Sequence, residues 1–231
     1  MALKTIDEPK MTVNKLGEFL VANPKRQRRI LEQLKYPKDN AFGFTPYGDV
    51  RDTIKKYFVS GFDEQIINDY ISTLETKAED PGLSDWNKGI INSSIEALEN
   101  VLDSDNINTE FIYEEYKGAN PKVLIHGVEI SINPDLIVTS EKRGKKCIGA
   151  LKIHISKNSS NNEEGSKYVA ALLNDYVIAH LQTDDNVCKN ENSISYDVFN
   201  RTFVESPKSF KRRMEDIDAG CMNIKAIWDS I

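Results

Sequence analysis

The sequence predicts a mixed α/β or α+β fold, in which a helical N-terminal part precedes a β-sheet flanked by helices. Apolar residues recur at helical spacing through the first hundred residues. After Asp105 they alternate with polar residues over short stretches, as they do in strands. The 231 residues, 39% of them hydrophobic, can bury a core of ordinary size. We therefore expect a helical domain at 1–105 and a second domain at 106–231.

Five helices are expected in the first part, each bounded by recognisable caps or breakers. Thr12 is a suitable N-cap for the first helix, and Pro24 separates the first helix from the second. Two prolines and a glycine predict a loop over 36–47. Pro81-Gly82 ends the fourth helix, and Ser84 or Asp85 caps the fifth. The expected helices cover 13–23, 25–35, 48–59, 63–77 and 85–102.

Strands dominate the next part of the chain. We expect three of them near 122–132, 134–140 and 146–156 to form one sheet, the last two joined by a charged hairpin with Gly144 at its tip. A helix from Glu163 to about Leu181 follows, then one or two strands within 194–204 and a last helix after Pro207. A strand, helix and strand in this order predict a mixed sheet covered by helices.

The third expected strand has two contrasting faces. Alternation places Leu151, Ile153 and Ile155 on one face and Ala150, Lys152, His154 and Ser156 on the other. The wholly apolar face must be core. The other face must meet water, a ligand or a polar partner, because a lone buried charge costs several kcal/mol.

Composition excludes several classes of protein. No apolar run is long enough to span a membrane, and the first residues lack the apolar stretch of a secretory signal. Three widely spaced cysteines match no metal motif and suggest free thiols in a cytoplasmic protein. A net charge of −6 argues against a globally basic nucleic-acid coat but is compatible with a locally basic groove.

The hairpin carries a chemical motif. Pro134-Asp135 opens one strand and Lys152 lies in the next, and a helix follows. Over roughly 108–205 this arrangement resembles the PD-(D/E)XK nuclease superfamily. The resemblance implies an αβββαβ core and hydrolysis of DNA phosphodiester bonds with Mg²⁺ or Mn²⁺, in phage biology or defence. Asp135 would bind the metal and Lys152 would orient the attacking water. The superfamily's second acid falls on Ala150, which cannot bind metal.

Another acid must then complete the metal site. Glu164 and Tyr168 are four residues apart on one helical face and resemble the Q-x-x-x-Y element of RecB-like members, with Glu in place of Gln. We therefore expect Glu164 to be the displaced catalytic acid and metal ligand. The fallback acids are Glu163 and, on a helix before the strands, Glu110, Glu114 and Glu115. An acid at Glu164 could equally stabilise the helix N-terminus through the helix dipole.

Basic clusters predict contacts with nucleic acid. The residues expected to make them are Lys142, Arg143, Lys145 and Lys146 on the hairpin, with His154 and Tyr168 near the site. Two further clusters cover 25–29 and 208–213. A solvated charged face is the alternative for each cluster, and a structural role is the alternative for His154.

Two other functions stay open. Ala150 favours a catalytically degenerate nuclease fold that binds nucleic acid or a protein partner within a larger complex. A structural protein is the third possibility, and its partner would dock on the N-terminal helical part.

Overall fold

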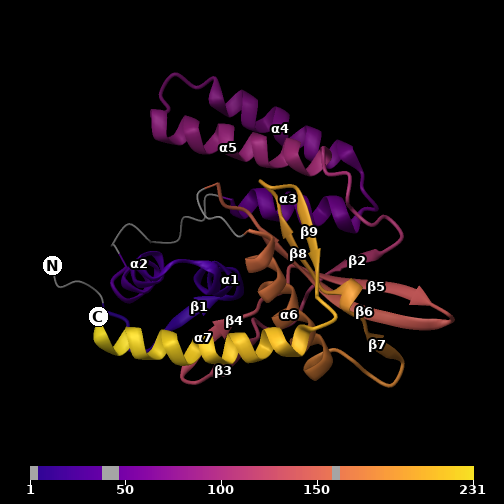
Figure 1. The fold of residues 1–231 in the computed structure, drawn as a ribbon. Helices are drawn as coiled ribbons and strands as arrows, with labels where there is room; N and C mark the ends of the chain where they lie inside the picture. The colour runs from indigo at the N-terminus through magenta and orange to yellow at the C-terminus, as the bar shows by residue number, and fades with distance from the viewer. Residues whose placement is uncertain (1–4, 38–46, 158–161) are drawn as a thin grey trace.

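The computed structural model describes residues 5–37, 47–157 and 162–231. Its centre is a twisted sheet with helices on both faces (Figure 1). The helices α4 and α5 lie side by side in an outer layer above α3, and the long helix α7 runs along the opposite side of the molecule. The predicted mixed α/β class is therefore confirmed. No helix in the described ranges is long and apolar enough to cross a membrane.

The five helices predicted in the first part are present. They are α1 (Val13–Val21), α2 (Pro24–Lys35), α3 (Gly48–Val59), α4 (Glu64–Ala78) and α5 (Asp85–Leu102). Thr12 caps α1 by accepting a hydrogen bond from the Lys15 N–H, and Ser84 caps α5 in the same way through the Asn87 N–H. The sequence did not predict β1 (Lys10–Thr12), which precedes α1. Most of the predicted loop at 36–47 lies outside the described residues.

The main sheet has the strand order β2-β5-β6-β8-β9, and β7 also pairs with β6. Its strands are β2 (Ile112–Glu115), β5 (Leu136–Lys142), β6 (Lys145–His154), β7 (Asn186–Cys188), β8 (Ile194–Asp197) and β9 (Thr202–Glu205). The strands β2, β5 and β6 are antiparallel. The helix α6 (Glu163–His180) then crosses over to β8, which is parallel to β6, and α7 (Phe210–Ser230) follows β9.

Two predictions about the strands are wrong. Residues 122–132 do not form one strand of the main sheet, because His126 and Gly127 both have positive φ and fold the segment into a tight turn. The resulting strands β3 (Lys122–Ile125) and β4 (Val128–Ser131) form a separate sheet with β1, in the order β1-β4-β3. The acids at 112–115 lie on β2 and not on a helix. In this strand Tyr113 is buried and packs on Phe58 of α3, whereas its neighbours on either side are exposed. Such alternation is typical of a strand.

Each face of the main sheet belongs to a different core. The predicted core residues Leu151, Ile153 and Ile155 are buried in the core that includes α3, α4 and α5. Ala150, on the opposite face of β6, is buried in the core that includes α1, α6 and α7. Helices from the first hundred residues therefore pack on both faces. The domain division at residue 105 stays a prediction.

Candidate functional site

Asp135 and Lys152 meet at one end of the β5–β6 hairpin. The hairpin register pairs Leu136 with Leu151, which places Asp135 beside Lys152. The Lys152 Nζ lies 3.1 Å from the Asp135 Oδ2, and the two side chains are only 8% and 6% exposed. The two residues that the sequence predicts to share a site are thus in direct contact.

Arg51 joins this pair from α3, 84 residues before Asp135. Its Nη1 donates to the Asp135 Oδ2 (3.1 Å) and to the Ile153 carbonyl oxygen (2.7 Å). The Ile153 N–H donates to the same Oδ2 (2.8 Å). One carboxylate oxygen is therefore in contact with two cations and a backbone amide. We call Asp135, Lys152 and Arg51 the Asp135 cluster.

The backbone before Asp135 helps to hold Lys152. Asn133 has a φ of 38°, in the left-handed region that asparagine tolerates better than most residues. Its carbonyl oxygen accepts a hydrogen bond from the Lys152 Nζ (2.6 Å). Burial lowers the pKa of Lys152 below its ordinary value; Asp135 opposes this effect and the charge of Arg51 adds to it. The lysine is thus fixed by a strained turn and a carboxylate.

Asn14, near the start of α1, reaches the same backbone. Its Nδ2 donates to the Ile153 carbonyl oxygen (3.1 Å), which Arg51 also contacts. Asn14 and Arg51 are functional candidates that the sequence analysis missed. No local pattern marks them, because each is a polar residue on an ordinary amphipathic helix and meets the sheet only in the folded chain.

The residues around Asp135 do not fit a Mg²⁺ or Mn²⁺ ion. The position of the second acid is occupied by Ala150, which is fully buried in an apolar core. A divalent ion at Asp135 would also lie beside the cations of Lys152 and Arg51, which would repel it. Across the described residues, no group of three or more His, Cys, Asp or Glu side chains could hold a metal ion. The metal cofactor stays a prediction without a matching donor set in that part of the chain.

Glu164, the predicted second acid, is engaged elsewhere. Its carboxylate is half-exposed and forms ion pairs with Lys167 and Arg213, each at 2.7 Å. Hydrogen bonds from these two residues lower the pKa of Glu164. Tyr168 lies under the Arg213 guanidinium, 4.7 Å from ring centroid to Cζ, and donates to Asp216 (3.3 Å). The predicted E-x-x-x-Y pair thus joins α6 to α7, and neither residue contacts Asp135.

The fallback acids are exposed and lie in three different places. Glu163 forms an ion pair with Lys167 at the start of α6 (2.9 Å). Glu115 contacts Lys55 of α3 (3.4 Å). Glu114 lies opposite Ile137 on the neighbouring strand, two residues along β5 from Asp135. The exposed Glu110 precedes β2. Of these acids, Glu114 and Glu115 are the nearest to Asp135 along the ladder.

Buried polar residues of β8 lie beside Lys152 and His154 at this end of the sheet. The register pairs Lys152 with Ser195, whose Oγ finds no hydrogen-bond partner among the described residues, and buried His154 with Asp197. Asp197 accepts hydrogen bonds from the Asn200 N–H (3.1 Å) and side-chain amide (3.0 Å). Its carboxylate therefore organises the β8–β9 turn.

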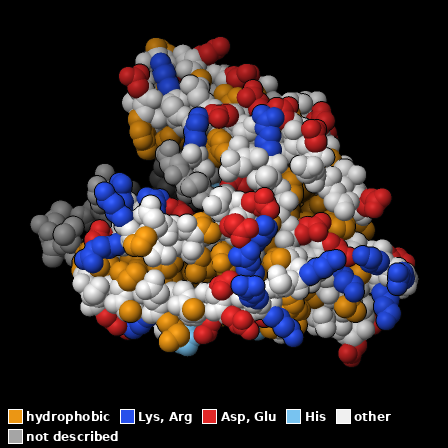
Figure 2. Space-filling view, viewed as in Figure 1, with side chains coloured by type: hydrophobic (Ala, Val, Ile, Leu, Met, Phe, Trp, Pro, Cys, Tyr) orange, Lys and Arg blue, Asp and Glu red, His pale blue; other side chains and the backbone are white. Residues whose placement is uncertain are grey.

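The basic hairpin is exposed and lies at the far end of the strands from Asp135. Arg143 and Gly144 both have positive φ and form a two-residue turn. Figure 2 shows basic side chains gathered over this hairpin, and Lys142 is paired there with Glu191 (2.7 Å). Lys142 comes seven residues after Asp135, so about 23 Å of strand separates them. The basic side chains of the hairpin tip therefore do not adjoin Asp135.

The other two basic clusters partly serve internal ion pairs. Arg26 contacts the buried carboxylate of Glu18 (3.0 Å between Nε and Oε1), and Arg213 contacts Glu164. Such pairs tie neighbouring helices together, so these arginines are less available to a ligand than exposed ones.

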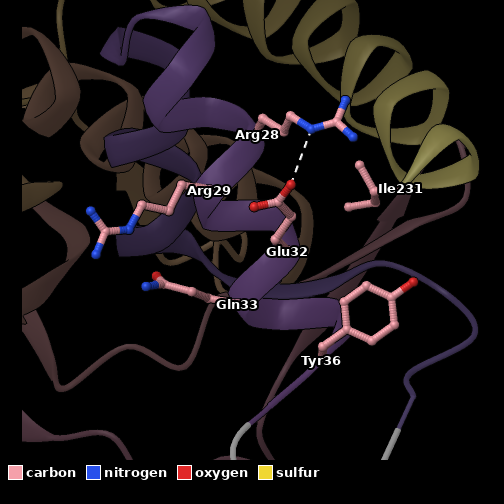
Figure 3. A pocket seen from close by; sticks show the side chains of 6 residues that line it. All are labelled: Arg28, Arg29, Glu32, Gln33, Tyr36 and Ile231. Carbon is pink, nitrogen blue, oxygen red and sulfur yellow. Dashed lines mark hydrogen bonds and ion pairs between the residues drawn. The ribbon is translucent and has the colours of Figure 1, made fainter. Parts of the chain in front are cut away.

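A hollow of about 760 Å³ lies between the end of α2 and the end of α7 (Figure 3). Its lining consists of Arg28, Arg29, Glu32, Gln33, Tyr36 and Ile231. The Arg28 Nε donates to the Glu32 carboxylate (3.0 Å), whereas Arg29 points away from the other side chains (Figure 3). This hollow shares no residue with the Asp135 cluster.

No protein-family model matches this chain, and no curated protein matches it significantly. Functional inference therefore depends on the chemistry of the Asp135 cluster and of the basic hairpin.

Proposed function

We propose that this chain binds the phosphodiester backbone of nucleic acid on a nuclease-like core, without a resident metal ion. The observation that carries the proposal is the neutralisation of the buried Asp135 carboxylate by both Lys152 and Arg51. Two cations and one carboxylate have an excess positive charge, which attracts a phosphate and disfavours a metal cation.

The order of the elements supports the nuclease-like core. Three antiparallel strands, β2, β5 and β6, are followed by the crossover helix α6 and the parallel strand β8. With α5 before them, these elements have the αβββαβ order that the resemblance implies. Asp135 precedes the second of the three strands and Lys152 lies in the third, as the resemblance also implies.

The basic hairpin supports nucleic acid as the ligand. Its four cationic side chains are exposed, and only Lys142 has an ion-pair partner in the described part of the chain. About 23 Å of strand separates the tip from Asp135, a distance that about seven base pairs of duplex would cover. A nucleic acid of that length, bound on the surface of the protein, would reach from the hairpin tip to the end of the strands where Asp135 lies.

A binding experiment tests the proposal. Fluorescence anisotropy would follow labelled duplex and single-stranded DNA in EDTA, with wild type and with Lys142, Arg143, Lys145 and Lys146 all changed to Gln. The wild type is expected to bind without divalent ions. The variant is expected to bind more weakly, and its slope of log K against log salt should fall by roughly 0.9 per lost duplex contact.

A matched pair of single variants is the control. Lys145→Gln removes one exposed charge from the hairpin, and Lys77→Gln removes one from α4. Only the hairpin change should reduce affinity. Absence of wild-type binding at low salt would refute the proposal, and equal affinities for all variants would make the hairpin a solvated turn.

Metal-dependent DNA cleavage is the second candidate function. The direct contact between Asp135 and Lys152 favours it, since the superfamily uses these two residue types together. Wild type, Asp135→Ala and Glu164→Gln would be compared on plasmid and single-stranded DNA with Mg²⁺ or Mn²⁺. Cleavage that both substitutions abolish would support hydrolysis with Glu164 as the second acid. Cleavage that survives Asp135→Ala would have to come from another site or another protein.

A further inference from the structure

Arg51 has unused hydrogen-bond donors at the Asp135 cluster. A guanidinium carries five N–H donors, and toward the described residues only Nη1 donates, to Asp135 and Ile153. The Nε–H and the two Nη2–H groups donate no hydrogen bond to a described residue. The Arg51 side chain is 29% exposed, compared with 8% for Lys152. Arg51 is therefore the more accessible of the two cations.

The position of Arg51 is fixed before any ligand arrives. Buried residues of α3, among them Val50, Ile54 and Phe58, pack α3 against the sheet. Two hydrogen bonds then hold Nη1 against Asp135 and Ile153. The free edge of a guanidinium held in this way presents parallel donors that match two oxygens of a phosphate. A preorganised group loses little conformational entropy on binding.

The neighbouring lysine on α3 cannot take this role. Lys55 lies one helical turn after Arg51, and its Nζ contacts both Asp52 (2.9 Å) and Glu115 (3.4 Å). Two carboxylates thus compete with a phosphate for Lys55. Arg51 shares a single carboxylate with Lys152, so of these two places on α3 the Asp135 cluster is the one with positive charge in excess.

We propose that Arg51 binds a backbone phosphate of the nucleic acid and that Asp135 is the positioning residue that holds it. The inference deepens the proposed function and rests on it, because it names the residue through which the backbone is bound. Asp135 then has the opposite task from the one expected of it, since it orients a cationic side chain where a metal ion was predicted.

Anisotropy titrations in EDTA would test this with Arg51→Gln, Arg51→Lys and the control Lys56→Gln. Lys56 is exposed on the same helix and lines a different surface hollow. Arg51→Gln should weaken binding about tenfold or more, as expected for loss of a charge-assisted contact, and should reduce the duplex salt slope by roughly 0.9. Arg51→Lys should keep the slope but lose affinity, because an ammonium cannot bind two oxygens in parallel.

A double-mutant cycle would test the positioning role. Asp135→Asn should weaken binding because it releases Arg51, whereas the double variant with Arg51→Gln should bind no more weakly than Arg51→Gln alone. Additive losses would show that Asp135 does not act through Arg51. Thermal unfolding of each variant in the absence of DNA would separate these effects from loss of the fold.

The outcomes distinguish this inference from the proposed function. If the hairpin variant weakens binding and Arg51→Gln does not, Arg51 is not a phosphate ligand but the proposed function stands. If wild type binds no DNA, the proposed function fails, and inorganic phosphate becomes the probe. Phosphate should then raise the unfolding temperature of wild type and Lys56→Gln more than that of Arg51→Gln. Equal shifts would overturn the inference.

Discussion

Lys152 is a buried amine, and two partners stabilise its charged form. Its Nζ contacts the Asp135 carboxylate and the Asn133 carbonyl oxygen, and Arg51 adds a second cation nearby. Removing a charge from water costs several kcal/mol, which good geometry only partly offsets. An unpaired charge left by loss of one partner costs about 3–5 kcal/mol. Such a costly arrangement at one end of a sheet is typical of a functional site.

The burial of Lys152 predicts a pH dependence of stability. Its pKa is lower in the folded than in the unfolded state, where it is near 10.5. Between these two pKa values the unfolded chain binds more protons, so the free energy of unfolding should rise with pH in that window. Urea unfolding of wild type and Lys152→Met would measure this rise. The rise should be absent from the variant. If the free energies of unfolding of the two proteins depend on pH in the same way, the prediction is wrong.

At the scale of elements, β6 is the strand on which the site depends. It pairs with β5, β7 and β8 and is covered on both faces. The segment 190–192 passes so close to β6 that a Cβ on Gly149 would lie 2.1 Å from the Asn192 carbonyl oxygen. Glycine is therefore required at this position by close approach of two backbones.

A pair of glycine substitutions tests that contact. Gly149→Ala should lower the free energy of unfolding by about 1–3 kcal/mol, because a backbone atom must move. Gly89→Ala, in α5, meets nothing within 4 Å and should raise it by about 0.5–1 kcal/mol through reduced chain entropy. Urea unfolding would measure both. Similar effects of the two changes would contradict the close approach at Gly149.

At the scale of the whole molecule, distant segments share each core. One core joins residues of β1, α1, α2, β4, α6 and α7. Trp228 of α7 is buried in it, its Nε1 donates to the Asp7 carbonyl oxygen (2.9 Å), and the Lys35 Nζ donates to its carbonyl oxygen (2.7 Å). The two ends of the described chain are thus held against the same set of helices.

Trp228 should accordingly be a major source of stability. Trp228→Ala is expected to reduce the free energy of unfolding by about 3–5 kcal/mol, as for other large buried aromatic residues. Met222→Ala, at an exposed position of the same helix, should change it by less than about 0.5 kcal/mol. Chemical denaturation followed by circular dichroism would measure both. A small effect of Trp228→Ala would mean that α7 adds little to this core.

Local features of the fold could be predicted from the sequence. Caps and breakers define the five early helices, and the β5–β6 hairpin follows from alternation around a glycine turn. The contact of Asp135 with Lys152 was also predictable, because a hairpin turn sets the register of its two strands. These features depend on residues that are close in the chain, where spacing alone determines which side chains meet.

Only the tertiary structure decided which further groups surround Asp135. Arg51 lies 84 residues before Asp135, and Asn14 lies 139 residues before Ile153. No periodicity in the sequence links positions so far apart. The same limit explains why 122–132 was assigned to the main sheet, because the pairing of β4 with β1 depends on a strand far earlier in the chain. It also applies to Glu164, whose partner Arg213 lies on α7. Helical spacing identifies the polar face of a helix, but the packing of whole elements decides what that face meets.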